Sequence, residues 1–280
     1  MVAKHQFCLC LILSLVIPML AVQAEHVTVQ IKNTAPEDGI LFAPVWIGFH
    51  NGSYDLFDAG QPISAGGVLE RLAEDGNPEP LQVEFGSTVP GGISGNLLGF
   101  EGFPDVPVFE PGEQASAAFD LDPWSNRFMS FGSMVIPSND AFIANDDPMA
   151  IELFDGFGNF KGKQTILILG TAVYDAGTEL NNEMDAAFLN QSAPDTGTTT
   201  SEAVRRHPGF IGSFTNPAPG EDPIILGAHI EPGLYIDPIA ADFTRPDVVI
   251  AEIVIIPEPA TALLLLGGAL AAFRKRPRAH

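Results

Sequence analysis

Two acidic segments carry the side chains in this chain that are best suited to chemistry. The first contains Asp140 and directly follows an apolar stretch. The second runs from residue 175 to residue 183 and is rich in Asp, Glu and Asn. Gly177 would let its backbone curl so that Asp175 and Glu179 face one ion, and calcium takes about six to eight oxygen ligands. Spacing alone leaves two interpretations open: a shared site for a hard cation, or ordinary solvated loops.

Short apolar runs separated by Gly, Pro, Asn and Asp predict the strands that must position these loops. Alternating apolar and polar residues indicate half-buried strands, and continuous apolar runs indicate strands in a sandwich core. The expected strands are 27–31, 81–85, 115–121, 128–136, 165–169 and 248–256, with one helix near 68–74 and an exposed Thr-rich loop at 192–206. This pattern predicts an all-β fold, an antiparallel β-sandwich with short helices in its loops.

The charge of the chain limits its partners. Its 13 Lys and Arg residues face 35 Asp and Glu residues, which gives a formal net charge of −22. Such a surface repels nucleic acid, so we expect no nucleic-acid partner. It favours solubility and cation binding.

The sequence contains none of the common catalytic signatures. His-Glu-x-x-His, Gly-x-Ser-x-Gly and phosphate-binding loops do not occur, and an EF-hand starting at Asp155 fails because Phe157 stands where an oxygen ligand is required. We interpret His50 as a hydrogen-bonded structural residue, and Trp46 and Trp124 as core or rim aromatics. We therefore expect a protein that is not an enzyme.

The first 24 residues have the pattern of a secretory signal peptide. Lys4 precedes an apolar run over residues 7–22, and small residues end at Ala24. Cys8 and Cys10, the two cysteines of the chain, both lie in this segment. The exported protein, with one domain expected over residues 25–256, would therefore have no disulfide.

Residues 257–280 combine three elements in a fixed order. Pro257-Glu258-Pro259 precedes an apolar run, 260–273, and a basic cluster, 274–278. The basic cluster favours the cytoplasmic side, and the run is shorter than the ~20 residues of a permanent membrane span. The arrangement resembles the PEP-CTERM sorting signal of Gram-negative bacteria. The resemblance implies processing by an exosortase-type protease, transient insertion of the C-terminal helix in the inner membrane, and a final location at the cell surface or outside the cell.

Four blocks of the expected domain resemble the spondin domain, the N-terminal module of F-spondin and mindin. They are Ile47-Gly48-Phe49-His50 leading to Tyr54-Asp55-Leu56-Phe57, Leu72-Ala73-Glu74-Asp75-Gly76, Ser133-Met134-Val135-Ile136-Pro137-Ser138-Asn139-Asp140, and Tyr174-Asp175-Ala176-Gly177-Thr178-Glu179. They keep the family's order. Asp75 replaces a Trp, Asn139 a Pro, and Glu179 an Asp of the family pattern.

This resemblance implies a β-sandwich of C2-like, spondin-domain type that holds a cation at one end. Carried over residue by residue, the implied metal ligands are Asp140, Asp175 and Glu179, and the implied ion is Ca²⁺. Glu179 keeps a carboxylate but lengthens its arm relative to Asp.

Two functions from different classes fit the sequence. The first is a non-catalytic adhesion module that binds exopolysaccharide or another extracellular matrix component and carries a structural calcium ion. The alternative is an extracellular hydrolase that acts on exopolysaccharide through carboxylates at the rim of the sandwich. The missing catalytic motif and the spondin resemblance favour the first.

Overall fold

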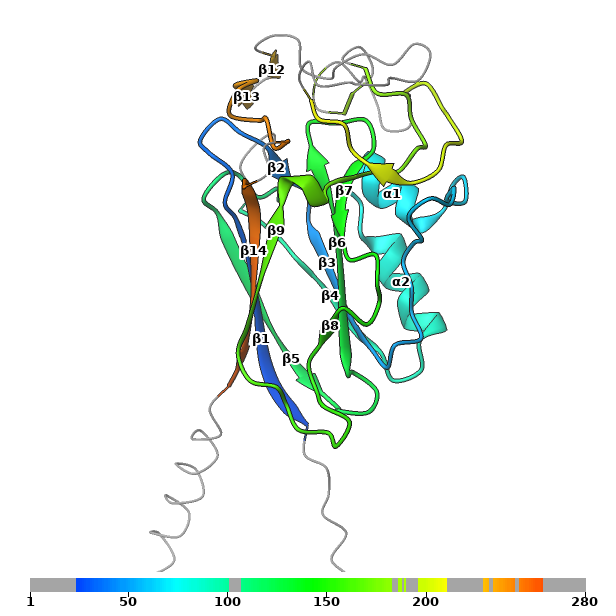
Figure 1. The fold of residues 1–280 in the computed structure, drawn as a ribbon, viewed down its shortest axis with the longest axis vertical. Helices are drawn as coiled ribbons and strands as arrows, with labels where there is room; N and C mark the ends of the chain where they lie inside the picture. Colours follow the sequence, from blue (N-terminus) through cyan, green and yellow to red (C-terminus); the bar gives the residue numbers. More distant parts are fainter. Residues whose placement is uncertain are drawn as a thin grey trace, which may run out of the picture.

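The chain folds into two antiparallel β-sheets that pack face to face, with two helices on the outer face of the larger sheet (Figure 1). The computed structural model describes residues 24–100, 107–182, 186, 187, 189, 196–210, 229–231, 234–244 and 247–258. The predicted all-β class and antiparallel sandwich are confirmed. The expected signal peptide (all but its last residue, Ala24) and the apolar run 260–273 lie outside the described residues. Within the part that is described, none of the helices has the length and apolar character needed to cross a membrane.

The smaller sheet has the strand order β5-β1-β14-β9. Its strands are β1 (Glu25–Asn33), β5 (Gln114–Leu121), β9 (Gln164–Leu169) and β14 (Val249–Pro257). In β1 the side chains of Val27, Val29 and Ile31 are buried, whereas Thr28 and Gln30 between them are only partly covered. This alternation places one face of the sheet on the core and the other toward solvent.

The larger sheet has the order β11-β10-β7-β6-β3-β4, and two further strands pair with β6. Its strands are β2 (Leu41–Phe42), β3 (Val45–His50), β4 (Ile93–Leu97), β6 (Phe128–Ile136), β7 (Ala141–Ala144), β8 (Ile151–Glu152), β10 (Tyr174–Asp175) and β11 (Arg205–Arg206). A short 3-10 helix, η1 (Gly170–Ala172), precedes β10. Outside this sheet, β12 (His229–Glu231) pairs with β13 (Leu234–Ile236). Every residue of β3 and β6 is buried. These strands are covered on one face by the smaller sheet and on the other by the helices.

The two helices, α1 (Val68–Asp75) and α2 (Glu79–Thr88), form a second apolar cluster against the larger sheet. The ring of Trp46 lies under α2, with its centroid 5.2 Å from that of Phe85. Gly132 lets α1 approach β6 closely, because a methyl group built there would lie 2.8 Å from Leu72 Cδ2. Helix α1 occupies the segment where the sequence predicts one.

The strand expected at 81–85 is wrong, because these residues lie within α2. The sequence Leu-Gln-Val-Glu-Phe alternates apolar and polar residues, but it also places Leu81 and Phe85 four residues apart on one helix face. Both of these side chains are buried, whereas Val83 is 72 % exposed. Pro80 in the first turn and the Asn77 side chain, which accepts a hydrogen bond from the Glu79 amide at 3.1 Å, favour the start of a helix here.

Candidate functional site

The two acidic segments meet because their strands are neighbours in the larger sheet. Asp140 precedes β7, and β7 pairs with β10 so that Ala141 lies opposite Asp175. Strand β10 pairs in turn with β11, which places Arg205 opposite Asp175. The site lies beside α1 at the end of the sandwich where β6 finishes (Figure 1).

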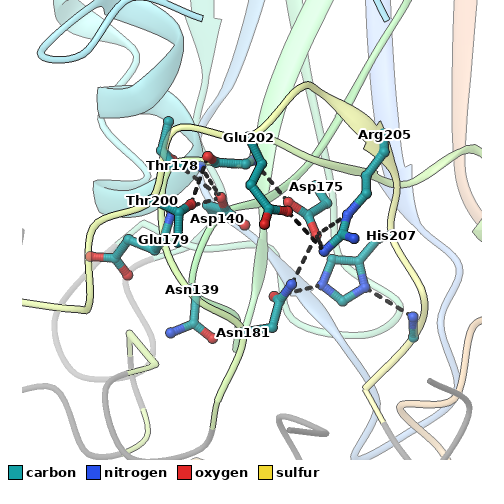
Figure 2. Close-up of polar contacts among 12 residues, drawn as sticks. Asn139, Asp140, Asp175, Thr178, Glu179, Asn181, Thr200, Glu202, Arg205 and His207 are labelled. Atoms are coloured by element: carbon teal, nitrogen blue, oxygen red, sulfur yellow. Dashed lines mark hydrogen bonds and ion pairs between the residues drawn. The ribbon is translucent and has the colours of Figure 1, made fainter. Parts of the chain in front are cut away.

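Asp140 is fully buried and organises the turn that follows β10. Its Oδ2 atom accepts hydrogen bonds from the Thr178 amide at 2.8 Å, the Thr178 hydroxyl at 3.1 Å and the Glu179 amide at 3.1 Å (Figure 2). Its Oδ1 atom is buried and has no hydrogen-bond partner among the described residues. One half of this carboxylate is therefore committed to the fold, and the other half is unsatisfied.

Asp175 lies beside Asp140, and both oxygens of its carboxylate accept hydrogen bonds (Figure 2). Oδ1 accepts a hydrogen bond from the Gly177 amide at 2.8 Å. Oδ2 accepts from Asn181 Nδ2 at 2.8 Å and from Arg205 Nε at 3.2 Å, and Arg205 Nη2 lies 3.1 Å away. Arg205 supplies the positive charge that faces this carboxylate.

Asn181 connects His207 to this hydrogen-bond network. The His207 Nδ1 atom accepts a hydrogen bond from the Gly209 amide at 3.0 Å. The other ring nitrogen, Nε2, therefore carries the proton and donates to Asn181 Oδ1 at 3.3 Å. Asn181 thus bridges the imidazole and Asp175, and the Gly209 amide fixes the His207 tautomer.

The structure places Glu179 differently from the other two predicted ligands. Its backbone amide binds Asp140, but its carboxylate points away from the Asp140–Asp175 pair (Figure 2). Glu179 Oε1 accepts a hydrogen bond from the Gly197 amide at 3.0 Å. Among the described residues, no group of three or more His, Cys, Asp or Glu side chains has an arrangement that could hold a metal ion.

The electrostatics of the site are dominated by buried carboxylates. Burial, followed by the neighbouring charge of Asp175, raises the pKa of Asp140 well above its ordinary value, although the three hydrogen bonds to Oδ2 oppose this shift. Burial also raises the pKa of Glu74 on α1 to about 8, with further contributions from Glu179, Glu70 and Asp140. Ionisation of these carboxylates would place excess negative charge in a buried site, and a proton or a metal cation would relieve it.

Sequence reasoning missed Arg205 and His207. It placed Asn181 in the second acidic segment without giving it a role, and it considered the stretch 74–78 as a further cation-binding loop but favoured a turn there. Glu74 comes from α1 and reaches the site only through tertiary packing. The expectation of an exposed loop at 192–206 is wrong at its end, because Arg205 and Arg206 form β11. The rarity of basic residues in so acidic a chain was the one available signal for Arg205.

Comparison with known proteins identifies the C-terminal segment. Residues 256–278 match the PEP-CTERM protein-sorting motif. This motif marks proteins of Gram-negative bacteria that are exported through exosortase to the cell surface, so exosortase is a processing partner of this chain. The comparison with curated proteins found no match.

Proposed function

We propose that the protein is an exported, non-catalytic module of spondin-domain type that acts at the cell surface in adhesion or matrix binding. The C-terminal motif supports the location. The four sequence blocks between Ile47 and Glu179, which keep the order of the spondin pattern, and the antiparallel sandwich support a module of spondin-domain type. The proposed ligand class is exopolysaccharide or another component of the extracellular matrix.

The same proposal includes one structural calcium ion at the Asp140–Asp175 pair. The observation that carries it is the fully buried Asp140 Oδ1 atom, which has no hydrogen-bond partner in the described part of the chain and lies beside a second carboxylate. An unsatisfied buried carboxylate oxygen is costly, and an oxygen-seeking cation would satisfy it. Asp140 and Asp175 would hold the ion, and Glu179 would join them by turning its carboxylate from Gly197. When bound, the ion would supply charge neutralisation and tie two loops together.

The hydrolase alternative gains no specific support from the geometry. Asp140 and Asp175 are 0 % and 1 % exposed. A general acid or base must come within hydrogen-bond reach of the substrate, so the burial of these two carboxylates does not favour a role for them in cleaving a polymer.

Calorimetric titration with calcium chloride tests the metal site directly. The chain should bind one ion with a dissociation constant of ~0.1–1 mM, as extracellular modules commonly do, and Asp140→Asn should abolish the binding heat. Cosedimentation with exopolysaccharide tests the ligand class, and an assay for new reducing ends separates binding from hydrolysis. Release of reducing ends by the purified chain would favour the alternative.

A further inference from the structure

The end of the sandwich opposite the Asp140 site is the end at which the sorting segment leaves the fold (Figure 1). The Glu258 amide donates a hydrogen bond to the His26 carbonyl at 2.8 Å, beside the first residues of β1. Strand β5 finishes there at Leu121, opposite Glu25, and β9 starts there at Gln164, opposite Ile255. The β5–β6 connection and the β8–β9 connection therefore share this end with Glu258.

Each of these two connections presents one exposed aromatic side chain. Trp124 in the β5–β6 connection is 55 % exposed, and Phe157 in the β8–β9 connection is 87 % exposed. Both values are high for side chains of this size, which are usually buried. No other described residues place two large aromatic side chains in adjacent turns with comparable exposure.

The two turns are built in the same way. The Asp122 Oδ1 atom accepts hydrogen bonds from the Trp124 amide at 3.0 Å and the Ser125 amide at 2.9 Å. The Asp155 Oδ1 atom accepts from the Phe157 amide at 2.8 Å and the Asn159 amide at 2.9 Å. In each case an aspartate two residues earlier fixes the backbone of the turn that carries the exposed aromatic residue.

The two turns also touch one another. A methyl group built on Gly158 would lie 3.3 Å from Trp124 Cζ2 and 3.5 Å from Pro123 Cβ. Gly158 has a φ of +81°, which favours glycine at this contact. Trp124 and Phe157 therefore belong to one aromatic tip made by both turns.

Chain length places this tip close to a membrane. Pro259 alone separates Glu258 from the apolar run that starts at Ala260. Two extended residues span roughly 7 Å, about the thickness of the ~5–7 Å headgroup layer on each side of the bilayer. The basic residues 274–278 favour the cytoplasmic side, so the folded domain faces the opposite, periplasmic leaflet.

We propose that Trp124 and Phe157 insert into the periplasmic headgroup region of the inner membrane while the sorting segment is anchored there. Tryptophan favours the membrane interface, where its apolar ring and polar N–H are both accommodated. The contact is apolar, because a chain with a net charge of −22 gains nothing from anionic lipid. The tip would hold the domain upright beside the protease that processes residues 257–259. The proposal rests on insertion of the C-terminal run and is independent of the calcium site.

Fluorescence quenching in vesicles tests this contact. The full chain is reconstituted into phosphatidylcholine vesicles that contain lipids brominated near the headgroup end of their acyl chains. Trp124 and Trp46 are the two tryptophans, and Trp46 is completely buried, so we expect loss of the Trp124 share of the emission and retention of the Trp46 share. Trp124→Phe should remove all lipid-dependent quenching, and Phe157→Ser should weaken it.

Ile239 provides a matched control at the other end of the sandwich. It is 77 % exposed, and its turn is joined to the β1–β2 connection by a hydrogen bond from the Asp237 amide to the Asp38 carbonyl. In a Trp124→Phe background, Ile239→Trp should give an exposed tryptophan that lipid does not quench. Quenching at this position as strong as at Trp124 would overturn the proposed orientation.

Two further outcomes contradict the proposal and can be told apart. A chain that floats with the vesicles but shows no Trp124 quenching is anchored without the aromatic contact. If Trp124 emission then shifts on addition of a soluble polysaccharide, the tip is a glycan-binding surface and not a membrane contact. If the chain does not float with the vesicles, the C-terminal apolar run does not insert into the membrane, and the proposal is wrong.

Discussion

Asp175 and Arg205 face each other across the β10–β11 pair, and Arg205 directs both Nε and Nη2 to the same oxygen of a carboxylate that is 1 % exposed. The Arg205 side chain is itself 35 % exposed. Asp175 therefore has its charge balanced from the solvent side, whereas the Oδ1 atom of the adjacent Asp140 has no hydrogen-bond partner in the part of the chain that the structure describes. Burial, followed by the neighbouring charge of Asp175, raises the pKa of Asp140.

Arg205→Met should destabilise the fold strongly in calcium-free buffer. Removing one partner of a buried ion pair leaves an uncompensated charge, and we expect a loss of about 2–4 kcal/mol, since Arg205 is partly exposed. Chemical denaturation measures this change. The matched control is Arg206→Met, which removes a cation–π contact 3.8 Å from the Tyr174 ring and should cost about 0.5–1 kcal/mol. Equal losses for the two variants would contradict the importance assigned to the Asp175 pair.

Gly177→Ala should destabilise the site more than the same change at Gly60. Both glycines have positive φ, +70° and +86°, which costs other residues about 1–2 kcal/mol. A methyl group at Gly177 would also lie 2.7 Å from the Glu202 carbonyl oxygen, whereas nothing lies within 4 Å at Gly60. Thermal unfolding of the two variants separates backbone strain from crowding. A Gly60→Ala variant as unstable as Gly177→Ala would refute this packing.

His50 should make the fold sensitive to acid. Its Nδ1 atom accepts a hydrogen bond from the Gly52 amide, and its Nε2 atom donates to Ser130 Oγ, each at 3.0 Å, so the buried ring is neutral. Burial lowers its pKa from 6.5 to about 4. The stability that depends on the neutral His50 ring is therefore fully present above pH 6.5 and is lost as the pH falls toward 4, by at most about 3 kcal/mol. The raised pKa of Glu74 acts in the opposite direction over this range.

Denaturation midpoints measured between pH 7 and pH 4 check this behaviour. Relative to the parent, His50→Gln should gain stability as the pH falls, because glutamine does not titrate. If the variant and the parent lose stability equally over this range, another group is responsible.

Export should remove both ends of the chain. The signal-peptide pattern predicts cleavage after Ala24, and the PEP-CTERM motif predicts processing near residues 257–259. The intact mass of the protein recovered from the cell surface should therefore match residues 25 to about 258. Recovery of the full precursor mass from that fraction would disprove both cleavage sites.

The sequence predicted the strands of the sandwich correctly where the residue types of a segment favoured a strand over a helix. In β1 the alternating apolar residues Val27, Val29 and Ile31 are all β-branched, which favours a strand, and in β14 a largely apolar run of strand length is rich in Val and Ile. The segment 81–85 failed because five alternating residues also fit one turn and a half of an amphipathic helix. The helix forms because it buries Leu81 and Phe85 against the larger sheet, and the local sequence does not encode this contact.

The site was only partly predictable for a similar reason. Asp140 and Asp175 lie in recognisable blocks, but their proximity depends on pairing between β7 and β10, which is a long-range register. Arg205 and Glu74 enter from a distant strand and a helix, with no local pattern that points to the site. The direction of the Glu179 side chain depends on its contact with Gly197, eighteen residues away.

The calcium site is the central claim, and thermal unfolding with and without calcium tests it most directly. At a hundredfold excess over the dissociation constant, one bound ion should stabilise the fold by ~2.7 kcal/mol. Asp140→Asn should remove this gain while the circular dichroism spectrum stays β-rich. Asp155→Asn, in an acidic loop at the other end of the sandwich, should keep it. A parent protein whose melting temperature does not respond to calcium, or an Asp140→Asn variant that responds as strongly as the parent, would show that the Asp140–Asp175 pair does not bind the ion.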